Sequence, residues 1–427
     1  MIVQLREMEQ RSRFAATPIV SATFFRGEAP VAVIRSRVGE ILLANPWLAG
    51  HLEHVNFADT STPVNLHVPD VNNINIDDYV TVAASDTISF SSIDDPKTIF
   101  DKVHSELPHI CKELPRRRLA AEKSRLFNIT IAVPASSTSN DALEFALIMS
   151  MSHIIADGHT YGAVFMMIDP TRPIVAMDPV RAVKILQPAL ELAPDALVVL
   201  NSVSFWLRFA VSTAIHFVWS LVVRGRGIQS VPQFRRVNAE FICEQKKLYK
   251  EQQPASPVST NDVIASWFLR AANATLGSVT VNLRGRVRSL GSLLAGNYST
   301  SILFEAADVV TPALIRKAFS SPPYLRRRGL GPDAPLIKVP WFRRFSYALV
   351  TNVSTLYEEI RFENCELLFN LPLMKWSTPN NLKLCFVFYY KKNEIGIMTN
   401  DEDAVAAYDG SVLEPLELNS EIKIAVL

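Results

Sequence analysis

Two apolar runs, separated by a short polar stretch, place the strongest constraint on how this chain can fold. The runs are LFNITIAVP at 126–134 and LEFALIMSMSH at 143–153, and the residues between them include ASSTSND. Apolar runs of this length, bounded by turn-forming residues, are typical of the two strands of a β-hairpin. The sequence therefore predicts a pair of buried strands, the second of which ends at a titratable side chain, His153.

Length and composition predict a large core. The chain has 427 residues, of which 48% are hydrophobic and 20% charged, which favours two domains over one. The net charge is +1 and the basic residues are scattered, so no nucleic-acid partner is expected. The four cysteines form no CxxC pair, and the charged N-terminus does not resemble a signal peptide. We expect a reduced, cytoplasmic protein without a metal site.

Helical and extended patterns alternate irregularly along the chain. A strand and turn are predicted at 17–27, and helices are predicted before Asn45-Pro46, behind Asp95-Pro96 and after Gly158. Because there is no steady βαβ alternation, we assign the chain to the α/β class in the broad, mixed α+β sense, with two lobes of mixed sheet and helices.

Proline residues mark the connection between the two lobes. They occur at Pro170, Pro173, Pro179, Pro188 and Pro194, which is typical of a crossover linker. We therefore predict an N-terminal lobe at 1–175, a linker at 176–233 and a C-terminal lobe at 234–427. The stretch STNDVIASWFLRAAN (259–273) in the last of these reads as an amphipathic helix that Thr260 or Asn261 can cap.

HIIADG at 153–158 is one of five stretches that together form a pattern. The others are LLANPWLAGHL (42–52), STNDVIASWFLRAAN (259–273), VNLRGRVRSL with GNYST (281–300) and LVTNVSTLYEEIRF (349–362). In this order they resemble the CoA-dependent acyltransferase superfamily, whose HxxxDG motif HIIADG matches. That superfamily includes BAHD-type acyltransferases, peptide-synthetase condensation domains, chloramphenicol acetyltransferases and wax ester synthases. The resemblance implies two chloramphenicol-acetyltransferase-like lobes with a channel between them.

The resemblance also implies a role for the residues of the motif. His153 would be the general base, a task suited to an imidazole because its ordinary pKa of about 6.5 lies near neutral pH. Asp157 would brace the site by pairing with an arginine of the second lobe, either Arg284 or, as second choice, Arg286. Gly158 would allow a tight turn where a Cβ would crowd.

Three further side chains are expected near the reaction. Asn297 of GNYST resembles the family asparagine that supports the second-lobe wall, and Thr351 and Ser354 are candidate contacts for the oxyanion or the acceptor. Acyl-CoA would be the co-substrate and no tightly bound cofactor is expected. The acceptor would be a hydroxyl or an amine, and the many Phe residues favour a lipophilic one. The absence of a GxSxG-type nucleophile motif argues against an acyl-enzyme.

The sequence departs from the family in one motif and leaves two alternatives open. RFENC at 361–365 stands where BAHD enzymes carry DFGWG, a motif regarded as structural. The chain could therefore be a non-catalytic relative that binds a lipid or a partner protein. It could also take its donor from a carrier protein, as condensation domains do. Those domains usually carry a doubled histidine at this place, whereas here Ser152 precedes His153, which disfavours this alternative.

The segment 196–223 is apolar and long enough to span a bilayer as one helix. Polar residues recur at every fourth position and predict one narrow stripe along it: Ser204, Arg208, Ser212, His216 and Ser220. A single crossing is not expected, because it would separate the two halves of a shared site. The segment would instead be buried in protein as an internal crossover helix, lie peripherally in the plane of a membrane surface, or dip into the bilayer and return on the same side.

Overall fold

The computed structural model describes most of the chain. The described residues are 1–6, 9, 17–55, 63–83, 88–92, 94–107, 110–111, 116–133, 143–182, 192–200, 202–224, 232–287, 290–320, 325–331, 333–338, 345–375 and 382–416. Side chains are not described at 116–118 and 216–224, so the predicted stripe positions His216 and Ser220 lie outside the described side chains. The predicted polar connection ASSTSND also lies outside the described residues.

The predicted hairpin strands are paired and form the centre of the N-terminal sheet. β6 (Phe127–Ala132) and β7 (Glu144–Ser152) are antiparallel, and β2 (Pro18–Arg26) pairs with the other side of β7. The sheet order is β12-β2-β7-β6-β5, with β5 at Val80–Ala83 and β12 at Glu366–Pro372. β6 and almost all of β7 are buried on both faces, which explains why these strands read as continuous apolar runs.

The outer strand of this sheet comes from the far end of the chain. β12 pairs antiparallel with β2, and the ring of Phe369 stacks on that of Phe24 with 4.7 Å between centroids. The predicted boundary at residue 234 therefore does not separate the two sheets. Pairing between strands so distant in sequence leaves no local signal that could have placed β12 in the N-terminal lobe.

The C-terminal lobe is built on a seven-stranded mixed sheet. The strand order is β10-β9-β11-β13-β14-β8-β15, and β11 is parallel to both of its neighbours. The strands are β8 (Gln233–Val237), β9 (Leu276–Asn282), β10 (Ser299–Glu305), β11 (Tyr347–Asn352), β13 (Leu382–Lys391), β14 (Glu394–Thr399) and β15 (Leu413–Pro415). A separate three-stranded sheet contains β1 (Ile2–Gln4), β4 (Val64–His67) and β3 (His51–His54).

Helices cover both lobes. They are α2 (Val31–Ala44), α3 (Pro96–Glu106), α4 (Arg116–Ala121), α5 (Gly158–Met166), α7 (Pro194–Leu200), α8 (Val203–Arg224), α9 (Ala239–Gln252), α10 (Thr260–Ala271), α11 (Pro312–Ser320) and α12 (Glu402–Tyr408). The helices predicted before Asn45, behind Asp95 and after Gly158 are α2, α3 and α5. The predicted cap of α10 was wrong by one residue: Ser259 caps it, in a reciprocal capping box with Asp262.

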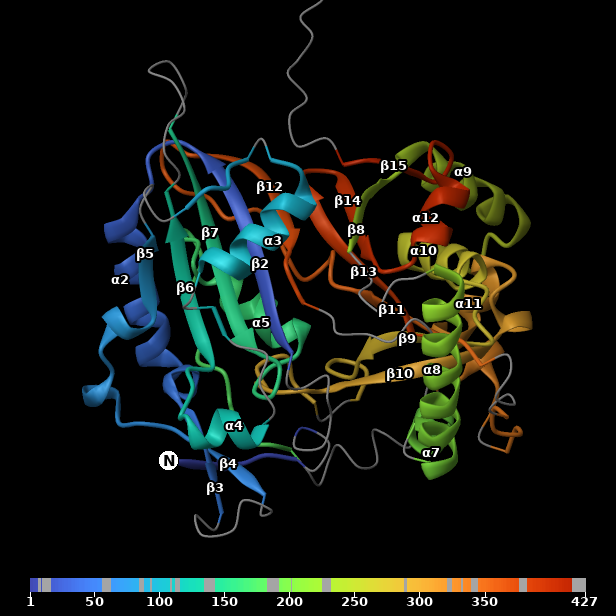
Figure 1. The fold of residues 1–427 in the computed structure, drawn as a ribbon, viewed down its shortest axis with the longest axis horizontal. Coiled ribbons are helices and arrows are strands. Elements are labelled where there is room, and N and C mark those ends of the chain that lie inside the picture. Colours follow the sequence, from blue (N-terminus) through green and yellow to red (C-terminus); the bar gives the residue numbers. More distant parts are fainter. Residues whose placement is uncertain are drawn as a thin grey trace, which may run out of the picture.

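The two sheets lie side by side, with α2 and α3 over the N-terminal lobe and α9 to α12 around the C-terminal one (Figure 1). One hydrophobic core joins them, because Phe388 of β13 and Met398 of β14 belong to the same buried cluster as Phe24 of β2. A second core lies within the C-terminal lobe. The chain thus has a mixed α/β architecture of two packed lobes, and the C-terminal end of β7 can meet residues of the second lobe.

The prediction of one continuous helix over 196–223 is wrong. α7 ends at Leu200 and α8 begins at Val203, with a bend of 62° between them. The cause is a helix start within the segment: Phe205 N donates to Ser202 Oγ, which caps α8. Within the described ranges no single helix is long and apolar enough to cross a bilayer, whereas the bent pair meets those two criteria together.

The exposed side of α8 is mainly apolar over its described side chains, 203–215. Val203, Leu207 and Ile215 are 83%, 58% and 47% exposed. Ser212, one of the predicted stripe positions, is instead buried, and its Oγ donates to Phe345 O at 2.8 Å. Phe205 packs inward against the ring of Tyr347, 5.9 Å away. Among its described side chains, α8 contacts the lobe through the buried Ser212 and Phe205. It presents mainly apolar side chains outward, including Trp206 at 49% exposure, while Ser204 is an exposed polar residue.

Candidate active site

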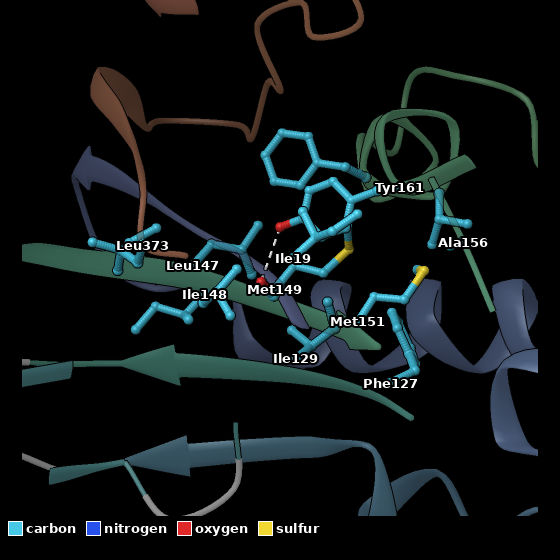
Figure 2. Close-up of a cluster of buried hydrophobic side chains, with 14 of the residues drawn as sticks. Ile19, Phe127, Ile129, Leu147, Ile148, Met149, Met151, Ala156, Tyr161 and Leu373 are labelled. Carbon is cyan, nitrogen blue, oxygen red and sulfur yellow. Dashed lines mark hydrogen bonds between the residues drawn. The ribbon is translucent and has the colours of Figure 1, made fainter. Parts of the chain in front are cut away.

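The turn after β7 is held rigidly between a strand and a helix. β7 ends at Ser152, and α5 begins at Gly158 with Asp157 as its N-cap, because Thr160 N donates to Asp157 Oδ1 at 3.0 Å. The Tyr161 hydroxyl of α5 donates back to Met149 O of β7 at 2.9 Å, as Figure 2 shows among the surrounding apolar side chains. The backbone of the turn is thus fixed at both ends.

His153 is the first residue of this turn and is only partly buried, although most of its neighbours are fully buried. Its Nδ1 lies 3.0 Å from Asn297 Oδ1, and Asn297 Nδ2 donates to the His153 carbonyl at 2.9 Å. Within the described ranges the imidazole makes no other hydrogen bond. One ring nitrogen is therefore engaged by the second lobe, and Nε2 is left available to a reactant.

Asp157 faces the second lobe and not the imidazole. Its Oδ2 accepts from Arg284 Nη1 at 2.7 Å and from Tyr298 N at 2.8 Å. Burial alone would raise the pKa of Asp157, but the charge of Arg284 and the hydrogen bonds to the carboxylate outweigh it and lower that pKa. The carboxyl group is therefore held ionised by its partner. The ion pair expected with a second-lobe arginine is made by Arg284.

The second-choice arginine lies elsewhere. Arg286 is exposed, and its guanidinium lies over the ring of Phe319, 5.6 Å from the centroid. Gly285, between the two arginines, has φ +72° in the left-handed region. A turn of this kind sends neighbouring side chains in different directions, so the spacing of Arg284 and Arg286 in the sequence does not show which of them is buried.

The remaining donors of Arg284 tie the same loop to the second lobe. Nη2 donates to Thr160 Oγ1 at 3.0 Å and to Gly296 O at 2.9 Å, and Nε donates to Leu294 O at 2.9 Å. The Thr160 hydroxyl in turn donates to Gly296 O at 3.1 Å. Thr160 is a site residue that the sequence analysis missed, and its position at N3 of the helix that Asp157 caps was the available signal.

Two glycines allow α5 to approach the segment that follows β11. A Cβ built on Gly158 would lie 3.1 Å from Val353 Cγ1, and one on Gly162 would lie 2.8 Å from Leu356 O. The crowding expected at Gly158 is therefore present, but Gly158 belongs to the first turn of a helix and does not need a special backbone conformation. Gly162, which the sequence analysis did not single out, has the closer contact, against backbone that cannot move aside.

Thr351 and Ser354 are not joined to the imidazole by hydrogen bonds. Thr351 Oγ1 shares a hydrogen bond of 2.9 Å with Thr280 Oγ1, and the Ser354 hydroxyl donates to Asn352 Oδ1 at 2.7 Å. Asn297 was expected to support the wall of the site, whereas it contacts His153 directly. Within the described ranges no group of three His, Cys, Asp or Glu side chains could hold a metal ion.

The stretch RFENC, where the resemblance expects DFGWG, serves as the entry to β12. Arg361 N donates to Asp169 Oδ2 at 3.0 Å, and the Phe362 ring packs on that of Phe25, 5.3 Å between centroids. Asn364 adopts φ +59° in the turn that follows. These contacts anchor β12, the strand that comes from the far end of the chain, to the N-terminal lobe. RFENC therefore has a structural role at this place although its sequence is not DFGWG.

Comparison with known proteins shows a shared fold. No family model and no curated protein matches the sequence. Solved structures match over almost the whole chain. Polyketide synthase associated protein 5 from Mycobacterium tuberculosis is 14% identical, with a TM-score of 0.51 and coverage of 93% of this chain and 91% of that one.

Two further structures have the same architecture. TRI101 from F. sporotrichioides, complexed with coenzyme A and T-2, is 10% identical, with a TM-score of 0.60 and coverage of 95% of this chain and 96% of that one. The first condensation domain of the CDA synthetase is 12% identical, with a TM-score of 0.53 and coverage of 93% and 90%. At this identity the likeness establishes the two-lobed fold.

Proposed function

We propose that this protein is an acyltransferase that moves an acyl group from an acyl-CoA thioester to a hydroxyl or amine acceptor. The observation that carries the proposal is the arrangement of His153: Nδ1 is engaged by Asn297, and Nε2 has no partner in the described part of the chain. The similarity in fold to TRI101, whose structure contains coenzyme A, supports a CoA thioester as donor. We propose no tightly bound cofactor.

In this proposal His153 acts as the general base. Nε2 takes the proton of the acceptor while the acceptor oxygen or nitrogen attacks the thioester carbonyl carbon. The tetrahedral intermediate then collapses, the C–S bond breaks, and the proton passes from the imidazolium to the departing thiolate. Thr351 and Ser354 are proposed contacts for the oxyanion or the acceptor. No covalent acyl-enzyme is formed.

The Asp157–Arg284 pair supports this chemistry from behind. Both side chains are buried, and the pair joins the loop of His153 to the second lobe. A catalytic base needs to be held within a narrow range of positions, because a small misplacement lowers the rate steeply. We therefore propose that Asp157 positions the loop and takes no part in proton transfer, and that the CoA arm enters between the lobes.

A thiol-release assay with a panel of acyl-CoAs, with and without lipid alcohols and amines, tests the proposal. We expect acceptor-dependent release, and we expect His153→Ala to lower turnover by about 10²–10⁴-fold. His159→Ala is the matched control, since His159 lies in the same region and, within the part of the chain that the structure describes, its ring hydrogen-bonds only to Ser292 O. Equal activity of the wild type and His153→Ala would refute the assignment.

The same assay separates the two alternatives. A carrier-protein-dependent enzyme would release thiol from an acyl-phosphopantetheinyl carrier and not from acyl-CoA. A non-catalytic relative would release none from either donor while still binding a lipid or a partner. The single serine at position 152, before His153, gives no support to the carrier reading.

A further inference from the structure

A buried carboxylate from the N-terminus lies behind the candidate base. The Glu9 side chain is 1% exposed and accepts from Arg181 Nε at 3.0 Å and from Arg6 N at 2.9 Å. Its Oε1 also accepts from Asn297 Nδ2 at 3.1 Å and from Asn297 N at 3.3 Å. Glu9 thus contacts Asn297, the residue that holds His153, although the two are 288 positions apart in the sequence.

These contacts determine which way the amide of Asn297 faces. Its Nδ2 is surrounded by three acceptors: Glu9 Oε1, the His153 carbonyl and the Ile154 carbonyl. Only an NH₂ group satisfies them, because a carbonyl oxygen in that place would face three other acceptors. The amide oxygen must therefore face His153 Nδ1, and an oxygen can only accept. The proton of the neutral imidazole is then on Nδ1, and the lone pair is on Nε2.

We infer that Glu9 is a positioning residue which, through the amide of Asn297, selects the imidazole tautomer that leaves Nε2 free to accept a proton. The inference rests on the proposed role of His153 as a base, but the tautomer can be observed without any activity. Of the three acceptors around Nδ2, Glu9 is the charged one, and hydrogen bonds to a charged acceptor are the stronger ones.

Arg181 keeps this carboxylate in its charged form. Burial alone would raise the pKa of Glu9, but the charges of Arg181 and Arg6 outweigh it and lower that pKa. Arg181 is itself fixed, because Nη1 donates to Ala295 O at 2.9 Å and a Cβ on Gly296 would lie 2.7 Å from its guanidinium. The network is therefore rigid from the arginine to the imidazole.

Selective ¹⁵N labelling of histidine and NMR test the inference directly. In the wild type at neutral-to-alkaline pH, we expect His153 to show a protonated Nδ1 and a bare Nε2, with the signal assigned by its loss in His153→Ala. In Glu9→Gln we expect a mixture of tautomers. The new amide would place an NH₂ group among the donors of Arg6 and Arg181, and the side-chain amide of Asn297 could then flip. We also expect kcat to fall by about tenfold or more with little change in KM.

Asp195→Asn is the matched control. Asp195 is also buried and paired, with Arg326 Nε at 2.9 Å, but it lies in α7 and has no contact with the site among the contacts described. It should lower stability without altering the His153 signals. A purely structural role for Glu9 predicts the same outcome for both variants, so an unchanged tautomer in folded Glu9→Gln would overturn the inference.

Two further measurements can refute the inference. A wild-type imidazole protonated at Nε2 would overturn it without any variant. If Glu9→Gln does not fold, Glu9→Asp can be used instead, because it keeps the charge that pairs with Arg181 but draws the carboxylate back from Asn297. This variant should shift the tautomer equilibrium of His153 partly. A spectrum identical to that of the wild type would contradict the inference. Correct tautomers with no acyl transfer would instead refute only the proposed function.

Discussion

The contact between the lobes around His153, which we call the junction, buries charged side chains. The outer side of α8 does the opposite and exposes apolar ones. At the junction, the charged side chains of Arg284 and Asp157 are 1% and 6% exposed. On α8, Leu207 and Ile215 are 58% and 47% exposed. Buried charges and exposed apolar patches are the informative exceptions in folded proteins, because most other residues follow the rule.

The two regions differ in whether the unfavourable placement of these groups is offset by partners within the chain. The buried charges of the junction are paired with each other and with backbone groups, so their arrangement is explained within the chain. In the described residues the apolar face of α8 remains exposed, so its explanation depends on the surroundings. We therefore expect the junction to be intolerant of single changes and the outer face of α8 to be tolerant.

The largest expected effect is that of Arg284→Met. It leaves the carboxylate of Asp157 buried and unpaired, which should lower the free energy of unfolding by about 3–5 kcal/mol and reduce turnover. Arg286→Met is the control, because this side chain lies two residues away and is exposed. It should change the free energy of unfolding and the turnover only slightly. Urea unfolding followed by circular dichroism measures the difference, and equal stabilities of the two variants would contradict the asymmetry.

Acid should weaken the junction in a predictable direction. The pKa of Asp157 is lowered in the folded state, so the stability it contributes is present above its unfolded pKa of about 3.9 and is lost as the pH falls through the folded pKa. Asp157→Asn should be less stable than the wild type at neutral pH, and the gap should narrow on acidification. A gap that is constant with pH, measured by thermal melting, would show that the carboxylate charge is not responsible.

On the inner side of α8, Ser212→Ala should have a moderate effect. Ser212 is fully buried, and its loss leaves the Phe345 carbonyl without this donor, which should cost about 1–3 kcal/mol of unfolding free energy. Ser204→Ala makes the same change at an exposed position of the same helix and should stay within about 0.5 kcal/mol of the wild type. Similar values for both would mean that the inner contact contributes little.

Features that depend on local sequence could be predicted. The strands β6 and β7 and the cap of α3 at Asp95 follow from apolar runs and from a capping residue before proline. His153 and Asp157 could be found because the motif keeps their spacing. The break before α8 was missed although Ser202, a good capping residue, provides a local signal for it.

Features that depend on distant contacts could not be predicted. Glu9 lies in a charged N-terminal segment, and nothing in the sequence singles it out. Its partners Arg181 and Asn297 come from distant parts of the chain. The choice of Arg284 over Arg286 depends on the turn at Gly285, and the place of β12 depends on pairing with β2. Each is a tertiary contact without a periodic pattern in the sequence.

The smallest effect on stability is expected for the double substitution Leu207→Ser and Ile215→Ser. Both side chains are exposed, so the free energy of unfolding should change by no more than about 0.5 kcal/mol for each. If this face rests on a bilayer, as the apolar composition of 196–223 predicts, the wild type should co-sediment with liposomes and the double variant should do so less. Ser204→Ala, on the same helix, should sediment as the wild type does. A wild type that stays in the supernatant would rule out the membrane explanation and leave the patch as a surface for another partner.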